Sequence, residues 1–182
     1  MEEKITIVIN GVGGCGKDTL VKFTAEKFWV KNVSSITPIK NIASVIGWDG
    51  SKDEKSRKFL SDLKKLTTEY NDYTLNYILN EQKDFLSGPE EIMFVHIREP
   101  EEIAKFVSFS QLKTYTLLVR PREELKDKYY GNRSDDEVEN YNYDFIFDNS
   151  KSIEESKQSW IEFFRKNIKK QSSFIKDQDC SN

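Results

Sequence analysis

The sequence contains little of what holds small secreted domains together or anchors a chain in a membrane. Among 182 residues there are two cysteines, Cys15 and Cys180, and a single histidine. Two cysteines make a poor disulfide framework, and neither has the spacing of a metal site. The first ten residues hold two acids and only a short apolar run, which fits neither a signal peptide nor a spanning helix. We therefore expect a cytoplasmic protein that does not bind membranes.

A strong charge of one sign is also missing. Charged residues make up 32% of the chain, yet the formal net charge is only −3. Such a surface is well solvated but has no field that would attract polyanions, so we expect no nucleic acid polymer as a partner. The length suits one domain, which we place at residues 1–170, followed by a polar tail at 171–182.

The apolar pattern predicts strands that alternate with helices. A β-branched run at 5–9 is typical of a buried parallel strand, and the residues from Lys17 onward show helical spacing. Ser152 and Glu155 form a capping box, and Pro100 suits the first turn of a helix. Further strands are expected at 34–39, 92–97, 114–119 and 145–147, and further helices at 59–66 and 73–86. This alternation predicts an α/β fold whose mostly parallel sheet is covered on both faces.

The stretch "GVGGCGKDT" at residues 11–19 satisfies two phosphate-binding patterns. Gly11, Gly13 and Gly16 match the dinucleotide fingerprint, whereas Gly11, Gly16 and Lys17 match the P-loop of nucleoside triphosphate enzymes. A dinucleotide site needs an acid at the end of the second strand, where this chain has Lys40. We favour the P-loop over both the dinucleotide site and a plain glycine-rich turn. The donor phosphates are then expected on Gly11, Gly13, Gly14, Cys15, Gly16, Lys17, Asp18 and Thr19.

Asp18 stands where a P-loop offers a serine or threonine hydroxyl to Mg²⁺. A carboxylate is also a hard oxygen ligand, so Asp18 is a candidate contact of that ion, directly or through a water. Thr19 would then donate to an inner phosphate. The alternative is an acid in the first turn of a helix, where the helix dipole favours it.

Three segments of the sequence resemble the P-loop nucleotide monophosphate kinases. They are "GVGGCGKDT", "REP" after a central strand and "NRSDDEVE" before the last strand, and the GKDT form is closest to the phage and bacterial deoxynucleoside monophosphate kinases. The resemblance implies a three-layer α/β/α fold with a five-stranded parallel sheet, ATP on the P-loop, an acceptor-binding region at about 40–86 and a lid at about 121–143. It also implies that Arg133, followed by Ser134, Asp135 and Asp136, contacts the transferring phosphate.

Two charged residues follow a buried strand and should lie at the ligand-binding edge of the sheet. Arg98 could clamp an acceptor phosphate, while Glu99 could hold Mg²⁺ through a water or cap the next helix. Lys40, Trp48 and Arg57 are the candidates for binding the acceptor.

The sequence therefore favours an ATP-dependent phosphotransferase with Lys17, Arg98 and Arg133 as catalytic residues. The expected acceptor is a nucleoside monophosphate, and a deoxynucleotide is favoured. A kinase of another small metabolite and a nucleotide-binding regulator with slow hydrolysis remain alternatives. The expected partners are small-molecule nucleotides, and the chain could form a homodimer.

Overall fold

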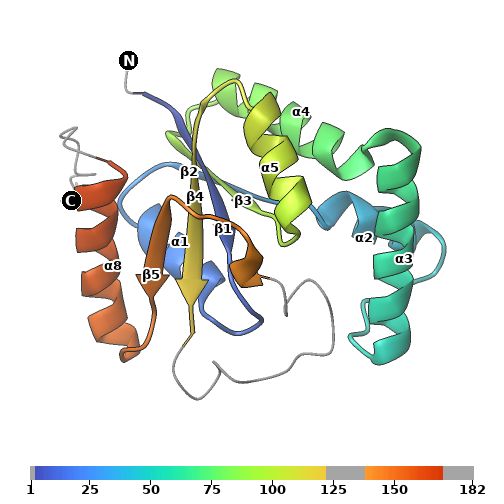
Figure 1. The fold of residues 1–182 in the computed structure, drawn as a ribbon, viewed down its shortest axis with the longest axis horizontal. Helices are drawn as coiled ribbons and strands as arrows, with labels where there is room; N and C mark the ends of the chain where they lie inside the picture. Colours follow the sequence, from blue (N-terminus) through green and yellow to red (C-terminus); the bar gives the residue numbers. More distant parts are fainter. Residues whose placement is uncertain (1–2, 122–137, 170–182) are drawn as a thin grey trace, which may run out of the picture.

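The computed structural model describes residues 3–121 and 138–169, and its centre is a five-stranded parallel sheet. The strands follow the order β2-β3-β1-β4-β5, and every neighbouring pair is parallel (Figure 1). Their bounds are Ile5–Asn10 for β1, Val30–Ser34 for β2, Ile92–His96 for β3, Lys113–Arg120 for β4 and Phe145–Asp148 for β5. The sheet is therefore of the open α/β type expected from the alternating pattern.

Helices cover both faces of the sheet. One face packs on α1 (Lys17–Ala25) and α8 (Ile153–Asn167), and the other packs on α4 (Tyr73–Ser87) and α5 (Pro100–Phe109). The central strand contributes to both cores, because Ile7 belongs to the first and Val8 to the second. A strand buried on both faces needs apolar residues at consecutive positions, which explains the run at the start of the chain.

The remaining helices extend to one side of the sheet. They are α2 (Thr37–Val45) and α3 (Glu54–Asn71) (Figure 1). A short 3₁₀ helix, η1 (Val138–Asn140), precedes β5. The carboxylate of Asp53 accepts a hydrogen bond from Ser56 N and so caps α3. Within the described ranges, no helix combines the length and apolar character that a membrane crossing requires.

The prediction of a strand at 34–39 is wrong. The second strand is Val30–Ser34, and Pro38 lies in the first turn of α2. A proline is tolerated there because the first helical N–H groups have no partner within the helix. The helix predicted from Lys17 onward is α1, which ends at Ala25, and 54% of Trp29 beyond it is exposed.

The other predicted elements are present, with shifted ends. The strands at 92–97, 114–119 and 145–147 correspond to β3, β4 and β5, and the helix predicted at 73–86 is α4. The capping box of Ser152 and Glu155 is confirmed at the start of α8. Most of the predicted lid and the predicted polar tail lie outside the described residues.

Candidate functional site

The glycine loop at residues 11–16 joins the central strand to α1 at the carboxyl edge of the sheet. β1 lies between β3 and β4, so the loop sits where chain connections run to opposite sides of the sheet. Crevices at such points are the usual ligand sites of open α/β sheets. The position of the loop therefore agrees with the phosphate-binding motif found in the sequence.

Glycine is required in the loop for conformation as well as for space. Gly11 and Gly16 have φ angles of 145° and 95°, which side-chain-bearing residues rarely adopt. A Cβ atom on Gly11 would lie 2.4 Å from Val119 O, and one on Gly16 would lie 2.3 Å from Asn149 Nδ2. The loop is thus wound closely against β4 and the end of β5, in a defined shape.

Lys17 places its ammonium over this loop. Its Nζ donates to Gly11 O at 2.5 Å and to Val12 O at 3.0 Å, and it lies 3.4 Å from the buried Cys15 Sγ. No side chain caps the N-terminus of α1. A cation and a helix N-terminus at one loop form a site with affinity for anions, and phosphate oxygens could replace the two carbonyls.

Asp18 extends from the first turn of α1 into solvent, with 86% of its side chain exposed. Its Oδ1 lies 4.0 Å from His96 Nε2, and the same His96 nitrogen is 2.9 Å from Asn32 Oδ1. Burial lowers the pKa of His96 to about 4, although the neighbouring Asp18 acts to raise it. His96 is therefore neutral at physiological pH, so it does not compensate the charge of Asp18.

The donor groups at this edge of the sheet suit Mg²⁺. Asp18 and Thr19 are both exposed beside Lys17, and carboxylate and hydroxyl oxygens are the hard ligands that this ion prefers. The described residues contain no group of three or more His, Cys, Asp or Glu that could hold a metal by themselves. The arrangement fits an ion held jointly by protein, water and phosphate, which is usual for Mg²⁺ at nucleotides. The metal role of Asp18 stays a prediction.

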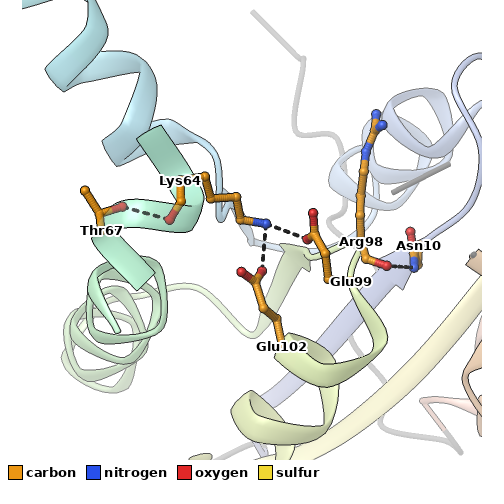
Figure 2. Close-up of polar contacts among 6 residues, drawn as sticks. All are labelled: Asn10, Lys64, Thr67, Arg98, Glu99 and Glu102. Carbon is orange, nitrogen blue, oxygen red and sulfur yellow. Dashed lines mark hydrogen bonds and ion pairs between the residues drawn. The ribbon is translucent and has the colours of Figure 1, made fainter. Parts of the chain in front are cut away.

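Arg98 lies at the same edge, directly after β3. Its carbonyl oxygen accepts a hydrogen bond from Asn10 Nδ2 at 2.9 Å, which brings its backbone beside the start of the glycine loop. Figure 2 shows its guanidinium pointing away from the Lys64 ammonium. The structure thus places Arg98 where the sequence predicted, although its phosphate-binding role stays a prediction.

Glu99 belongs to a cluster of charged groups between α3 and α5. Lys64 Nζ is 2.5 Å from Glu99 Oε2 and 2.8 Å from Glu102 Oε2 (Figure 2). Burial raises the pKa of Glu102, while Lys64 acts to lower it. Glu99 occupies the N-cap position of α5, where the helix dipole favours an acid, but its side chain makes no capping hydrogen bond. Its role as a Mg²⁺ ligand stays a prediction.

The predicted acceptor-binding residues lie on the helices beside the sheet. Lys40 and Arg57 are exposed on α2 and α3, and Trp48 is half-buried in the connection between these helices. The Trp48 Nε1 atom is buried and has no hydrogen-bond partner among the described residues. A buried indole N–H without a partner is rare in folded proteins.

A cavity of about 190 Å³ lies between α3, α4 and α5. Its apolar lining includes Ile78, Ile97 and Phe106, and its polar lining includes Thr68 and Glu102. Within the described part of the chain, the buried Thr68 Oγ1 atom has no hydrogen-bond partner. Nothing in the sequence pattern indicates this cavity, because its walls come from three helices and the end of β3.

The predicted lid arginine, Arg133, lies outside the described residues. Arg120, the last residue of β4, donates to both carboxylate oxygens of Glu139, at 3.2 and 3.0 Å. Because this guanidinium is already paired with a carboxylate on η1, Arg120 is a weaker candidate for a contact to the transferring phosphate.

Sequence reasoning missed two asparagines of this site. Asn149 follows β5 and donates from Nδ2 to Cys15 O at 2.8 Å, while its buried Oδ1 has no partner in residues 3–121 and 138–169. Asn10 ends β1 and contacts Gly11, Arg98 and Tyr143. Both are polar residues at the carboxyl end of a buried strand, and that position was the available signal.

No family model matches the sequence, and no curated protein matches it. Among solved structures, it resembles a protein of Chloroflexus aurantiacus to which kinase activity is ascribed, with 10% identity and a TM-score of 0.52. That match covers 92% of this chain and 100% of the other. It also resembles TT1252 of Thermus thermophilus, with 12% identity, a TM-score of 0.51 and coverage of 91% and 98%. At these identities the likeness concerns the fold alone, and the predicted three-layer α/β/α fold with a five-stranded parallel sheet is confirmed.

Proposed function

We propose that the chain is an ATP-dependent phosphotransferase whose acceptor is a nucleoside monophosphate, with a deoxynucleotide favoured. The observation that carries the proposal is the closed glycine loop with the Lys17 ammonium over it, next to Arg98 at the carboxyl edge of the sheet. Phosphoryl transfer needs mainly alignment and positive charge around the moving group. A donor loop and an arginine on neighbouring strands supply both.

Each residue has a distinct part in this proposal. The backbone N–H groups of the loop and Lys17 bind the β- and γ-phosphates of ATP. Mg²⁺, held by Asp18 directly or through a water and aided by Glu99, would neutralise the phosphate oxygens. Arg98 binds the acceptor phosphate, Lys40 and Arg57 assist from α2 and α3, and Arg133 remains a proposed contact from the segment outside the described residues.

The surroundings of Arg98 support a nucleotide as the acceptor. Ile97 precedes Arg98 and lines the cavity, so the cavity lies next to the proposed phosphate clamp. An apolar lining with a few polar groups is typical of sites for flat rings such as nucleobases. The unpartnered Thr68 Oγ1 and the Glu102 carboxylate could accept hydrogen bonds from amino groups of a base. This is why a nucleotide is favoured over a sugar.

A panel of acceptors tests the proposal. Initial rates of ADP formation would be measured with ATP and Mg²⁺ fixed and with each common deoxynucleotide or ribonucleotide monophosphate, a sugar and a small hydroxy acid. We expect at least one nucleotide to exceed the acceptor-free rate. A response to the sugar or the acid alone would replace this acceptor with another metabolite. Slow ADP release that ignores every acceptor would indicate a nucleotide-binding regulator.

Three variants connect the activity to the site. Lys17→Ala should lower kcat by about 100- to 1000-fold, because it removes charge that stabilises the transition state. Lys22→Ala is the matched control, since Lys22 is an exposed lysine on the same helix. Arg57→Ala should chiefly raise KM for the acceptor, whereas Arg98→Ala should change both KM and kcat. Unchanged turnover in Lys17→Ala would contradict the P-loop assignment.

A further inference from the structure

Asn10 is a polar residue with no solvent exposure at the last position of β1. Its Oδ1 accepts a hydrogen bond from Gly11 N at 2.8 Å. Its Nδ2 donates to Arg98 O at 2.9 Å and to the Tyr143 hydroxyl at 2.7 Å. One side chain thus joins the glycine loop, the end of β3 and the segment before β5, and Figure 2 shows its contact with Arg98.

The neighbours of this amide permit a single orientation. Gly11 N can only donate and Arg98 O can only accept, so exchanging Oδ1 and Nδ2 would oppose like groups in both places. Tyr143 completes the network because its hydroxyl donates to Val138 O at 2.8 Å while accepting from Asn10. Burial raises the pKa of Tyr143 to about 12, so this hydroxyl keeps its proton at physiological pH. A buried network with every partner satisfied resists displacement.

The network fixes a separation that matters for phosphoryl transfer. Gly11 begins the loop that would bind the donor, and it is also confined by β4, because a Cβ there would lie 2.4 Å from Val119 O. Arg98 would bind the acceptor phosphate. Donor and acceptor must meet nearly in line at contact distance, and small misplacements are costly. The Asn10 amide bridges the backbone of these two groups directly.

We propose that Asn10 is a positioning residue that sets the separation between the donor-phosphate loop and Arg98, with Tyr143 holding its amide in place. This inference rests on the function proposed above. Asn10 touches neither substrate in this proposal; it acts through Gly11 and Arg98.

Gln82 on α4 provides a matched control, because it contacts Thr6 near the other end of β1. It is 2% exposed, and its Nε2 donates to Thr6 Oγ1 at 3.0 Å and to Ser110 Oγ at 2.8 Å. Its Oε1 accepts from Gln111 N at 3.2 Å. Both amides are therefore buried with three partners, but Gln82 contacts β1 at Thr6, at the opposite end from the glycine loop. Asn10→Leu and Gln82→Met replace each amide with an apolar group of similar shape.

The kinetic test compares these variants with the nucleotide acceptor that the wild type uses best. Asn10→Leu should lower kcat by about 10- to 100-fold while the Kd for ATP stays within about twofold. Tyr143→Phe should lower kcat less, because the Asn10 to Arg98 bond remains. Gln82→Met should lose thermal stability but keep kcat within about twofold at a temperature where all variants are folded. Equal kcat losses in Asn10→Leu and Gln82→Met would overturn the inference, as would normal kcat in Asn10→Leu.

Two further measurements keep the inference separate from the proposed function. Crystal structures of the wild type and Asn10→Leu should differ in the distance between Gly11 N and Arg98 O, and an unchanged distance would overturn the inference even if no nucleotide acceptor is found. A wild type that phosphorylates no nucleotide would refute the proposed function alone.

If Asn10→Leu does not fold, Asn10→Asp replaces it in the kinetic test. Its carboxyl group can donate to Arg98 O only when protonated, so its kcat relative to the wild type should recover as the pH falls, and absence of recovery would count against the inference.

Discussion

Asp18 is a residue whose local position allows two roles, and the structure leaves it accessible for both. It is an acid in the first turn of α1, favoured there by the helix dipole, and its exposed carboxylate stands beside the glycine loop. A metal contact would act on catalysis, whereas a dipole contact would act only on the stability of the fold. The two roles therefore predict different measurements.

We expect Asp18→Ala to raise the Mg²⁺ concentration needed for the half-maximal rate, because it removes an oxygen ligand of the ion. Glu154→Ala is the control, since Glu154 is an acid in the first turn of α8 and lies outside the proposed site. Both variants should lose about 0.3–1 kcal/mol of stability from the helix dipole. Mg²⁺ titrations of activity and thermal unfolding would be measured together. A loss of stability with a normal Mg²⁺ requirement would refute the metal role.

His96 should make the stability of the protein depend on pH. Burial lowers its pKa from an ordinary value of 6.5 to about 4 in the folded chain. His96 is therefore protonated near pH 6.5 in the unfolded chain but only near pH 4 in the folded chain. The free energy of unfolding is therefore unaffected by His96 above about pH 6.5. It falls by about 3 kcal/mol as the pH approaches 4, because protonation then favours the unfolded chain.

His96→Gln isolates this contribution. Glutamine can still bond to Asn32, but it does not titrate, so the variant should lose less stability between pH 6.5 and 4 than the wild type. Denaturant unfolding at a series of pH values measures the difference, because all other titrating groups are shared. Parallel stability curves would show that His96 is not held neutral.

At the scale of elements, Lys4, which precedes β1, binds the end of α4 through hydrogen bonds. Its Nζ donates to Phe85 O, Gly88 O and Glu90 O, each at 2.7 Å. The last carbonyls of a helix have no partners within it, and a lysine there also complements the helix dipole. The chain between α4 and β3 is thereby held against the strand that leads into the glycine loop.

Lys4→Met keeps the apolar stem and removes the donor, and we expect it to cost about 2 kcal/mol. Lys83→Met is the control, because Lys83 is exposed on α4 and its hydrogen bond to Asn80 Oδ1 is long, at 3.4 Å. The control should change stability by less than about 0.5 kcal/mol. Denaturant midpoints compare the two variants. Equal midpoints would mean that the three contacts of Lys4 contribute little.

At the scale of the whole molecule, the central strand connects the nucleotide loop to both cores. β1 supplies Ile7 to the core under α1 and α8 and Val8 to the core under α4 and α5. A ligand on the loop binds only where this strand and its neighbours are in place. Binding should therefore stabilise the entire described fold and not the loop alone.

ATP with Mg²⁺ at 100 times its Kd should stabilise the wild type by about 2.7 kcal/mol. Lys17→Ala should lose most of this shift at the same ATP concentration, while Lys22→Ala should keep it. Thermal unfolding with and without nucleotide measures the effect. The absence of a shift in the wild type at millimolar ATP would contradict nucleotide binding at the loop.

The sequence by itself determined those features that depend on neighbours along the chain. The strand, glycine loop and helix from Ile5 to Ala25, the proline at the start of α5 and the capping box of α8 all follow from contacts within a few residues. The same local pattern located Lys17 at the start of the first helix and Arg98 directly after a buried strand. Periodicity and turn chemistry act over these short distances, so a single sequence records them.

Only the tertiary structure decided which distant residues meet. Asn10 bonds to a residue 133 positions away, and Lys64 pairs with Glu99, 35 positions away. The true position of β2 also depended on tertiary structure, because Val30–Ser34 is weakly apolar and gains its place by pairing with β3. Such contacts are set by strand order and helix packing, and the local sequence pattern carries no information on either. The Asn10 network and the cavity between α3, α4 and α5 could therefore be found only in the folded chain.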